Sequence, residues 1–326
     1  MLSRVADSIY WLGRYLERAE NYARFIDVNY NLMLDLPPGM DEQWEPLIAV
    51  TGDLEDYKKR HPTSDRKSAI FFLAFDEENP NSLLSSISRA RENARVVREN
   101  LNKETWEKLN EVYLQAKQGY KAKIWQMDDP RGFFIHIKYA IQLLYGIADT
   151  TVARTEAWYF NRLGQYLERA DKTSRVLDVK YHILLPAPEE VGSPLDYLHW
   201  MALLKSVSGF NTYRRAYGKI VPHGVVEFLM LDKFFPRSTF FCLTEAEECL
   251  YKISGYSGKG FSNSTEKYMG ELRSKLEFAD INDVINKGLH EYIDDIQIKI
   301  NIISNTIHEN FFMTRDNLVE QKQVNE

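Results

Sequence analysis

Apolar residues recur three or four positions apart along most of the chain, and convincing alternation of apolar with polar residues is scarce. Spacing of this kind matches the period of an α-helix, about 3.6 residues, whereas a half-buried strand alternates with a period of about two. The hydrophobic pattern therefore predicts an all-α protein, built as a large helical bundle.

Prolines, glycines and polar clusters divide this pattern into separate elements. The predicted helices cover residues 3–34, 41–50, 83–100, 103–119, 130–182, 194–206, 211–217, 221–231, 238–253 and 281–312. Polar residues at 58–65 and a glycine- and serine-rich stretch at 254–264 predict loops. The clearest break is the proline- and glycine-containing stretch 186–194. We expect a single helical domain over 1–326, which can be divided into 1–185, with both Glu-Arg helices described next, and 186–326.

One predicted helix is present twice. The segment LGRYLERAE at 12–20 returns as LGQYLERAD at 163–171, and each copy continues to an Arg and then to an Asp-Val pair. Any mixture of Leu, Ile and Val would rebuild an apolar core, so the retention of the charged residues indicates that they share a task. The sequence therefore predicts an internal repeat of a Glu-Arg helix, with Glu17 and Glu168 as its acidic residues.

Helical geometry places these charges. In the first copy the apolar residues share one stripe, and a set of polar residues lies on the opposite side: Glu17, Glu20, Asn21 and Arg24. Adjacent Glu17 and Arg18 are about 100° apart on a helix and do not face each other. The same holds for Glu168 and Arg169. Each charge therefore needs a partner from another element.

The predicted helix 83–100 carries Arg91, Arg95 and Arg98 on one stripe. Three neighbouring guanidinium groups repel one another, and facing carboxylates would relieve that repulsion. The acidic stripes on offer are Glu17, Glu20, Glu168 and Asp171. We hypothesise a central polar seam where the two Glu-Arg helices meet this arginine helix. In a buried seam, removal of one partner costs roughly 3–5 kcal/mol, whereas a solvated pair contributes about 0–1 kcal/mol.

A structural interpretation stands beside this hypothesis. Glu20 with Arg24, and Asp171 with Arg175, have the i,i+4 spacing of common surface pairs. An inherited polar interface can also be purely structural and never touch a substrate. The pattern leaves both interpretations open.

Composition excludes several classes of partner. Charged residues make up 27% and hydrophobic residues 44%, as in an ordinary globular protein. The net charge of −6 gives no global field that attracts a phosphate backbone, so we expect no nucleic acid. Cys242 and Cys249 fit neither a disulfide framework nor a zinc pattern, and the histidines are scattered, so we expect no metal and no cofactor.

The sequence also lacks an uninterrupted apolar run of roughly 18–20 residues, so no membrane association is expected. Residues 1–8 carry charges within the first helical turns, unlike a signal peptide. We expect a mature amino terminus and a cytoplasmic protein.

Four segments together resemble the bacterial alpha-E domain family: 1–21, 90–95, the Glu-Arg pair at 168–169, and 227–229 leading to 235–238. The resemblance covers nearly the whole chain. It implies an α-helical domain with a characteristic Glu-Arg motif, whose genes often lie beside or are fused to circularly permuted ATP-grasp ligases and transglutaminase-like proteins. That context implies a role in ATP-dependent amide or peptide bond formation, or in processing the product. The matching residues are Glu17, Arg18, Glu168, Arg169, Arg91, Asn93, Arg95 and Arg237.

Three classes of function follow, and whether the chain is an enzyme stays open. The preferred one is an accessory protein that docks on an ATP-grasp-type ligase, with a transglutaminase-like protein as a second partner, and binds a charged small molecule or peptide at the seam. The second is a helical enzyme with Glu17 or Glu168 as general acid or base. The third is a structural scaffold or homo-oligomer. The candidate substrate-binding residues are Arg18, Arg169, Glu20, Arg24, Asp171, Arg175, Arg91, Asn93, Arg95 and Arg237.

Overall fold

The computed structural model describes residues 1–35, 44–61, 63–182, 193–256 and 260–313. All regular structure in these ranges is helical, which confirms the predicted all-α class. The α-helices are α1 (Ser3–Asp35), α2 (Glu45–Thr51), α3 (Leu54–Arg60), α4 (Arg66–Ala74), α5 (Leu83–Val96), α6 (Lys103–Lys121), α7 (Arg131–Thr151), α8 (Glu156–His182), α9 (Pro194–Ser206), α10 (Phe210–Tyr217), α11 (Pro222–Leu231), α12 (Thr239–Ser254), α13 (Ser264–Glu277), α14 (Ile281–Lys287) and α15 (Leu289–Ile307).

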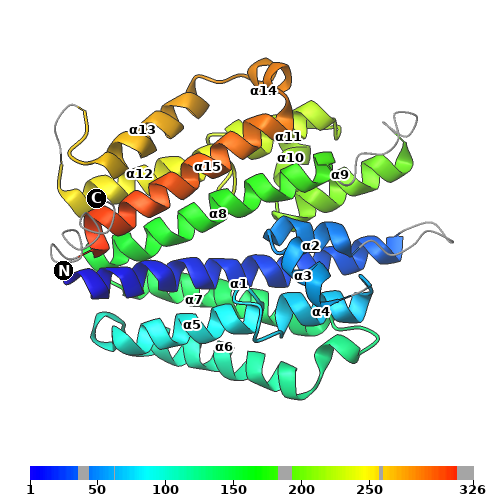
Figure 1. Ribbon diagram of the computed structural model, residues 1–326, viewed down its shortest axis with the longest axis horizontal. Coiled ribbons are helices and arrows are strands. Elements are labelled where there is room, and N and C mark those ends of the chain that lie inside the picture. The colour runs from blue at the N-terminus through cyan, green and yellow to red at the C-terminus, as the bar shows by residue number, and fades with distance from the viewer. Residues whose placement is uncertain (36–43, 62, 183–192, 257–259, 314–326) are drawn as a thin grey trace.

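Helices α1 and α8 run side by side through the middle of the molecule (Figure 1). Helices α5 and α7 pack on α1, and α6 packs on these two, forming one flank. Helices α12 and α15 pack on α8, and α13 covers them on the opposite flank. The two helices that carry the Glu-Arg segments are therefore the centre of the bundle, which leaves them little contact with solvent.

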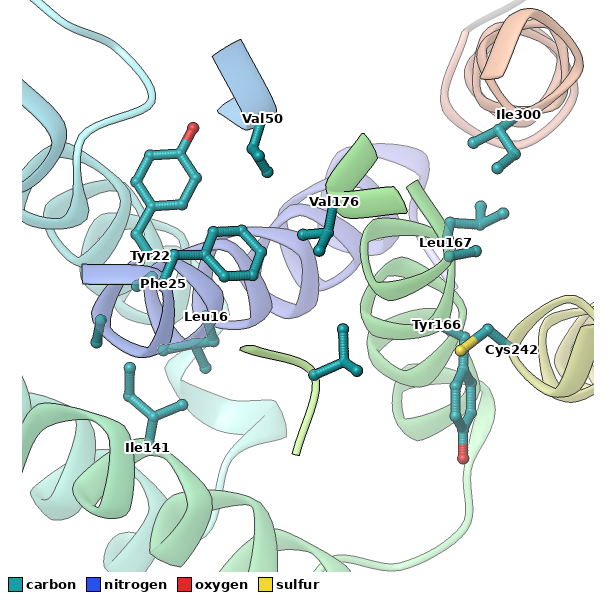
Figure 2. Close-up of a cluster of buried hydrophobic side chains, with 14 of the residues drawn as sticks. Leu16, Tyr22, Phe25, Val50, Ile141, Tyr166, Leu167, Val176, Cys242 and Ile300 are labelled. Atoms are coloured by element: carbon teal, nitrogen blue, oxygen red, sulfur yellow. The ribbon is translucent and has the colours of Figure 1, made fainter. Parts of the chain in front are cut away.

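This central position explains why α1 is buried on both of its faces. The apolar stripe contributes Leu16 to a core that also contains Phe25 of α1, and Leu167 and Val176 of α8 (Figure 2). The opposite, polar stripe is buried as well, since Glu17 is 0% exposed. The charges expected on the far side of the helix therefore lie inside the protein.

Two glycines set how closely α1 and α8 approach. A Cβ atom on Gly13 would lie 2.1 Å from the carbonyl oxygen of Asn161, and one on Gly164 would lie 2.2 Å from that of Tyr10. Real side chains do not tolerate such contacts, so only glycine permits this backbone-to-backbone crossing. The crossing lies one helical turn before each Glu and fixes the two motifs relative to each other.

Two predicted helices are divided in the structure. The predicted helix 130–182 is wrong, because α7 ends at Thr151 and α8 begins at Glu156 after an extended Val152. The predicted helix 281–312 is divided at Gly288, whose φ of 91° separates α14 from α15. Its last turn, His308–Phe312, is a π-helical turn.

Smaller differences concern loops and boundaries. Helix α3 extends to Arg60 within the predicted loop 58–65, and α13 lies in a stretch for which no helix was predicted. The break at 186–194 lies mostly outside the described residues, as do the predicted division between 185 and 186 and the start of the predicted helix 41–50. Within the described ranges, no helix is both long enough and apolar enough to cross a membrane.

Candidate functional site

The two Glu-Arg motifs pair reciprocally. Glu17 on α1 accepts hydrogen bonds from Arg169 on α8, at 2.9 Å from Nε and 2.8 Å from Nη2. Glu168 on α8 accepts from Arg18 on α1, at 2.7 Å from Nε and 3.1 Å from Nη2. Both are two-pronged guanidinium–carboxylate contacts, the strongest geometry for such a pair. The expectation that each motif needs a partner from another element is confirmed.

We call the group around the first carboxylate the Glu17 centre; it consists of Glu17, Glu20, Arg24, Arg169 and Arg237. Arg237 lies just before α12 and bridges two carboxylates, with Nη1 3.1 Å from Glu17 and Nη2 2.8 Å from Glu20. Arg24 pairs with Glu20 and donates to the Ser208 hydroxyl. This centre thus places three guanidinium groups around two buried carboxylates.

We call the second group the Glu168 centre; it consists of Glu168, Asp171, Arg14, Arg18, Lys172 and Arg175. Arg14 donates from Nε to Glu168 at 2.9 Å, and the Lys172 ammonium lies 3.7 Å from the same carboxylate. Asp171 accepts from Arg175 at 3.0 Å. Here four cations, all from α1 and α8, surround two buried carboxylates.

Uncharged groups complete both centres. Gln165 stands in the second copy where Arg14 stands in the first, and it donates to Glu17 at 3.3 Å just as Arg14 donates to Glu168. Gln142 of α7 donates to Glu20 at 2.8 Å, and Asn81 accepts from Arg18 at 2.6 Å. Equivalent positions of the two helices therefore make equivalent contacts, whereas the helices around them supply different partners. The internal duplication itself stays a prediction from the sequence.

The environment holds both motif carboxyls in their ionised form. Burial by itself would raise the pKa of Glu17, but the charges of Arg169 and Arg237 outweigh it and hold the pKa far below its ordinary value. Burial would likewise raise the pKa of Glu168, but the charges of Arg18 and Arg14 outweigh it and hold the pKa well below its ordinary value. A general acid or base needs a pKa near the working pH. Neither carboxyl meets that requirement.

The cations of the two centres differ. Burial lowers the pKa of Arg24 and of Arg237, and the guanidinium groups crowded around Glu17 lower both further. By contrast, Glu168 outweighs burial and raises the pKa of Arg18. In the Glu17 centre Glu17 outweighs burial and raises the pKa of Arg169 alone, so Arg24 and Arg237 are the two cations whose charged form is disfavoured there.

Three predicted site residues lie elsewhere. Helix α5 does pack on α1, but through small and apolar residues, including Ala90 and Ala94. Arg91 consequently turns toward α6 and donates to Asn110 at 2.7 Å, and Arg95 pairs with exposed Glu92. Asn93 is partly buried on the same helix. The hypothesis that this arginine stripe faces the motif carboxylates is wrong.

Sequence reasoning missed several members of the centres: Arg14, Lys172, Gln165, Gln142 and Asn81. The first three stand within or directly after the repeated segment, one turn from the motif Glu. They differ in type between the copies, so a search for shared charges passes over them. Gln142 and Asn81 carry no comparable signal. In the described part of the chain, no cluster of three or more His, Cys, Asp or Glu residues is arranged to hold a metal ion.

The fold and site together define an all-α protein organised around two buried, reciprocally paired Glu-Arg motifs. The chain belongs to the Alpha-E family, described as a predicted alpha-helical domain with a conserved ER motif, which matches residues 1–312.

Relatives include Uncharacterized protein Mb2597 of Mycobacterium bovis and Uncharacterized protein Rv2567 of Mycobacterium tuberculosis. Each is 24% identical over 314 residues, which is 90% of this chain and 34% of the relative. The chain thus spans about a third of the length of these relatives. No solved structure matches it.

Proposed function

We propose that this chain is a non-catalytic helical accessory module of an ATP-grasp-type amide or peptide ligase, and that its Glu-Arg motifs lock the central helices together. The observation that carries this proposal is the state of the two motif carboxylates. Each is 0% exposed, and each has both oxygens occupied by guanidinium donors. To reach either carboxylate, a ligand would have to displace the arginine that pairs with it, which would leave a buried charge without its partner.

The ligase as partner comes from the family resemblance, which implies a genetic association with ATP-grasp and transglutaminase-like proteins. The length of the relatives supports a modular role, since the matched region is about a third of each of them. A module attached to or acting beside other domains needs a rigid body rather than its own reaction centre. The paired core of α1 and α8 provides that rigidity.

The pKa values argue against the alternative of a stand-alone acid–base enzyme. Glu17 and Glu168 stay ionised at neutral pH and are shielded from solvent, so neither is suited to exchange a proton with a substrate. In the scaffold alternative the same Glu-Arg pairs hold the central helices together, and the chain assists no ligase.

The test is a reconstituted ligation assay. The purified chain, an ATP-grasp ligase encoded beside a gene of this family, and both together are supplied with ATP and a mixture of amino acids. ADP release and amide products are then measured. We expect no turnover by the chain alone and more product from the ligase when the chain is added. Turnover by the isolated chain would overturn the accessory role, and an unchanged ligase rate would favour the scaffold.

A matched pair of variants sharpens this assay. Glu17→Gln keeps the shape of the side chain but removes its charge, whereas Arg91→Gln changes a charge outside both centres. The accessory role predicts that any Glu17→Gln protein that remains folded, as judged by circular dichroism, still assists the ligase as Arg91→Gln does. Complete loss of activity in folded Glu17→Gln protein would support a catalytic carboxylate instead.

A further inference from the structure

A cleft of about 610 Å³, lined by both polar and aromatic side chains, opens beside the Glu168 centre, between the amino-terminal half of α1 and the end of α15. Its volume falls in the range typical of small-molecule sites, about 300–1,000 Å³. Arg14 lies in its wall and connects it to the buried core, because the same guanidinium donates to Glu168. The cleft therefore contacts the Glu168 centre through Arg14 without containing either motif carboxylate.

The guanidinium of Arg14 is held in a fixed position. Its Nε binds Glu168 at 2.9 Å, and its Nη1 donates to the Tyr10 hydroxyl at 2.9 Å and to the Ser304 hydroxyl at 3.0 Å. The remaining nitrogen, Nη2, makes no hydrogen bond to any residue that the structure describes. Arg14 is only 8% exposed. A buried, oriented cation with an unused donor at the edge of a cleft is suited to bind an anion.

The charge balance around Arg14 favours an additional anion. In the Glu168 centre four cations surround two carboxylates, so positive charge is in excess inside the protein. Such an excess is costly in a medium of low dielectric constant, and an anion placed against Arg14 would offset part of it.

The other wall of the cleft supplies neutral donors. Asn301 lies one turn before the adjacent pair Ser304 and Asn305 on α15, and the wall continues into the π-helical turn with His308. The two asparagines offer amide donors, whereas the Ser304 hydroxyl already donates to the carbonyl of Ile300. π-Helical turns are rare and recur at functional sites. Trp11 closes the side nearest Arg14, with its ring 5.4 Å from the guanidinium carbon. Amide and guanidinium donors thus converge from two helices on one space.

The lining selects the type of anion. Among the residues that line the cleft in the described ranges, Arg14 carries the one permanent positive charge, and Glu309 adds a negative charge on the wall. A phosphate with its second charge would meet one cation and one repelling carboxylate. A carboxylate has a single charge and two oxygens, which match the free Arg14 nitrogen and a side-chain amide of the facing wall.

We propose that the Arg14 cleft binds the carboxylate end of an amino acid or short peptide. The site rests on geometry alone, but its place in the proposed function is that of a substrate-holding site of the accessory module. It also replaces the seam as the place where a charged ligand is bound, because the seam is closed by internal pairs whereas the cleft is open.

The experiment titrates the full chain with four probes and follows heat by calorimetry and the fluorescence of Trp11. The probes are L-alanine, trialanine, L-alaninamide and inorganic phosphate. We expect saturable binding of L-alanine, trialanine or both, and at least about tenfold weaker binding of alaninamide and phosphate. The first two probes separate a free amino acid from a peptide end. A Trp11→Phe variant assigns the fluorescence change to the cleft, because the chain has 6 tryptophans.

Variants of Ser304 keep the test independent of the folded core. Ser304→Asp places a carboxylate against Arg14 and should weaken binding of L-alanine and trialanine about tenfold or more, whereas Ser304→Ala should change it less than about threefold. The proposal is overturned if folded wild-type protein shows no binding at probe concentrations up to about 10 mM, where even a very weak site would be detected. Equal binding by Ser304→Asp, or preference for phosphate or alaninamide, also overturns it.

The outcome is distinguishable from failure of the accessory role. If wild-type protein assists the ligase but binds no carboxylate probe, the cleft inference is wrong and the proposed function stands. If the cleft binds L-alanine or trialanine but the chain does not assist the ligase, the reverse holds. If Ser304→Asp loses both binding and assistance while Ser304→Ala keeps them, the cleft is the substrate-holding site.

Discussion

The Glu17 and Glu168 centres are built on two nine-residue segments that share seven residues, and they lie in different surroundings. In both, a carboxylate is paired with the Arg of the other copy and with the residue one turn before that Arg. The Glu168 centre takes its cations from α1 and α8 alone, whereas the Glu17 centre adds Arg237 from the start of α12.

This difference teaches which part of the arrangement belongs to the helix pair. The reciprocal contacts need only α1 and α8, whereas the third cation of the Glu17 centre, Arg237, comes from outside this pair. One centre consequently ties the pair to α12, and the other opens toward the cleft formed with α15. The predictions that follow test how far the two centres are equivalent.

The largest effect is expected from neutralising either motif carboxylate. Glu17→Gln and Glu168→Gln each leave buried guanidinium groups without their counter-charge and should lower the free energy of unfolding by roughly 3–5 kcal/mol. Glu17→Gln should be the more costly, because burial and neighbouring guanidinium groups already lower the pKa values of Arg24 and Arg237, and Glu17 is the charge that favours their ionised form. Urea denaturation measures both. Arg91→Gln is the control and should stay within about 0.5 kcal/mol of wild type.

Costs below about 1 kcal/mol for both carboxylate variants would mean that the pairs behave as solvated ones and that the lock does not exist. A larger loss for Glu168→Gln than for Glu17→Gln would reverse our ranking of the two centres.

The third cation should separate the centres next. Arg237→Gln removes hydrogen bonds of 3.1 and 2.8 Å to two carboxylates and should cost about 1.5–3 kcal/mol. Lys172→Gln removes contacts of 3.7 Å to Glu168 and 3.2 Å to the adjacent Asp171, both longer than those of Arg237, and should cost less. Thermal unfolding followed by circular dichroism compares the two variants. Equal losses would show that the third cation is interchangeable between the centres.

The glycine crossing should behave symmetrically. Gly13→Ala and Gly164→Ala each push a methyl group against a carbonyl oxygen of the other helix and should cost roughly 1–3 kcal/mol, although alanine favours a helix. Gly146→Ala in α7 meets nothing within 4 Å and should be neutral or stabilising by up to about 1 kcal/mol. Chemical denaturation gives the three values. If only one of the first two is destabilised, the crossing is not equivalent from both sides.

The stabilisation from the two Glu-Arg pairs should decrease gradually as the pH falls. Because the pKa values of Glu17 and Glu168 are depressed by folding, their stabilisation is present above the ordinary pKa of 4.5 and is lost as the pH falls toward the folded value. Each carboxyl can account for a loss of up to about 1.4 kcal/mol per pH unit. The gap in stability between wild type and Glu17→Gln should therefore narrow between about pH 4.5 and pH 3. A gap that stays constant over this range would contradict the depressed pKa.

Much of the fold follows from local signals in the sequence. The period of the apolar residues predicts most helices, and capping residues such as Ser82 and Ser238 mark where two of them begin. The interruptions in helix 130–182 and before α15 carry weak signals. Val152 breaks the first without a proline or glycine nearby, and Gly288 is a single glycine in a strongly helical pattern.

The candidate site shows the same division between local and tertiary information. Glu17, Arg18, Glu168 and Arg169 were predictable because a repeat reveals which charges are kept together. Local sequence patterns do not show which face of α5 meets α1. In the structure Ala90 is buried on that helix, and Arg91 turns away from α1 to Asn110 of α6. The Arg14 cleft could not be predicted from local patterns, because its lining residues are as far apart in the sequence as Tyr10 and Asn305.

The distance along the chain between the paired residues has a consequence for synthesis. Arg169 follows Glu17 by 152 residues, and Arg237 follows it by 220. At translation rates of about 5–20 residues per second, α1 leaves the ribosome roughly 8–30 s before its partner helix exists. During that interval we expect the charged stripe of α1 to be hydrated, because its partner side chains do not yet exist. We expect the charges that are buried in the finished protein to help keep this nascent segment soluble.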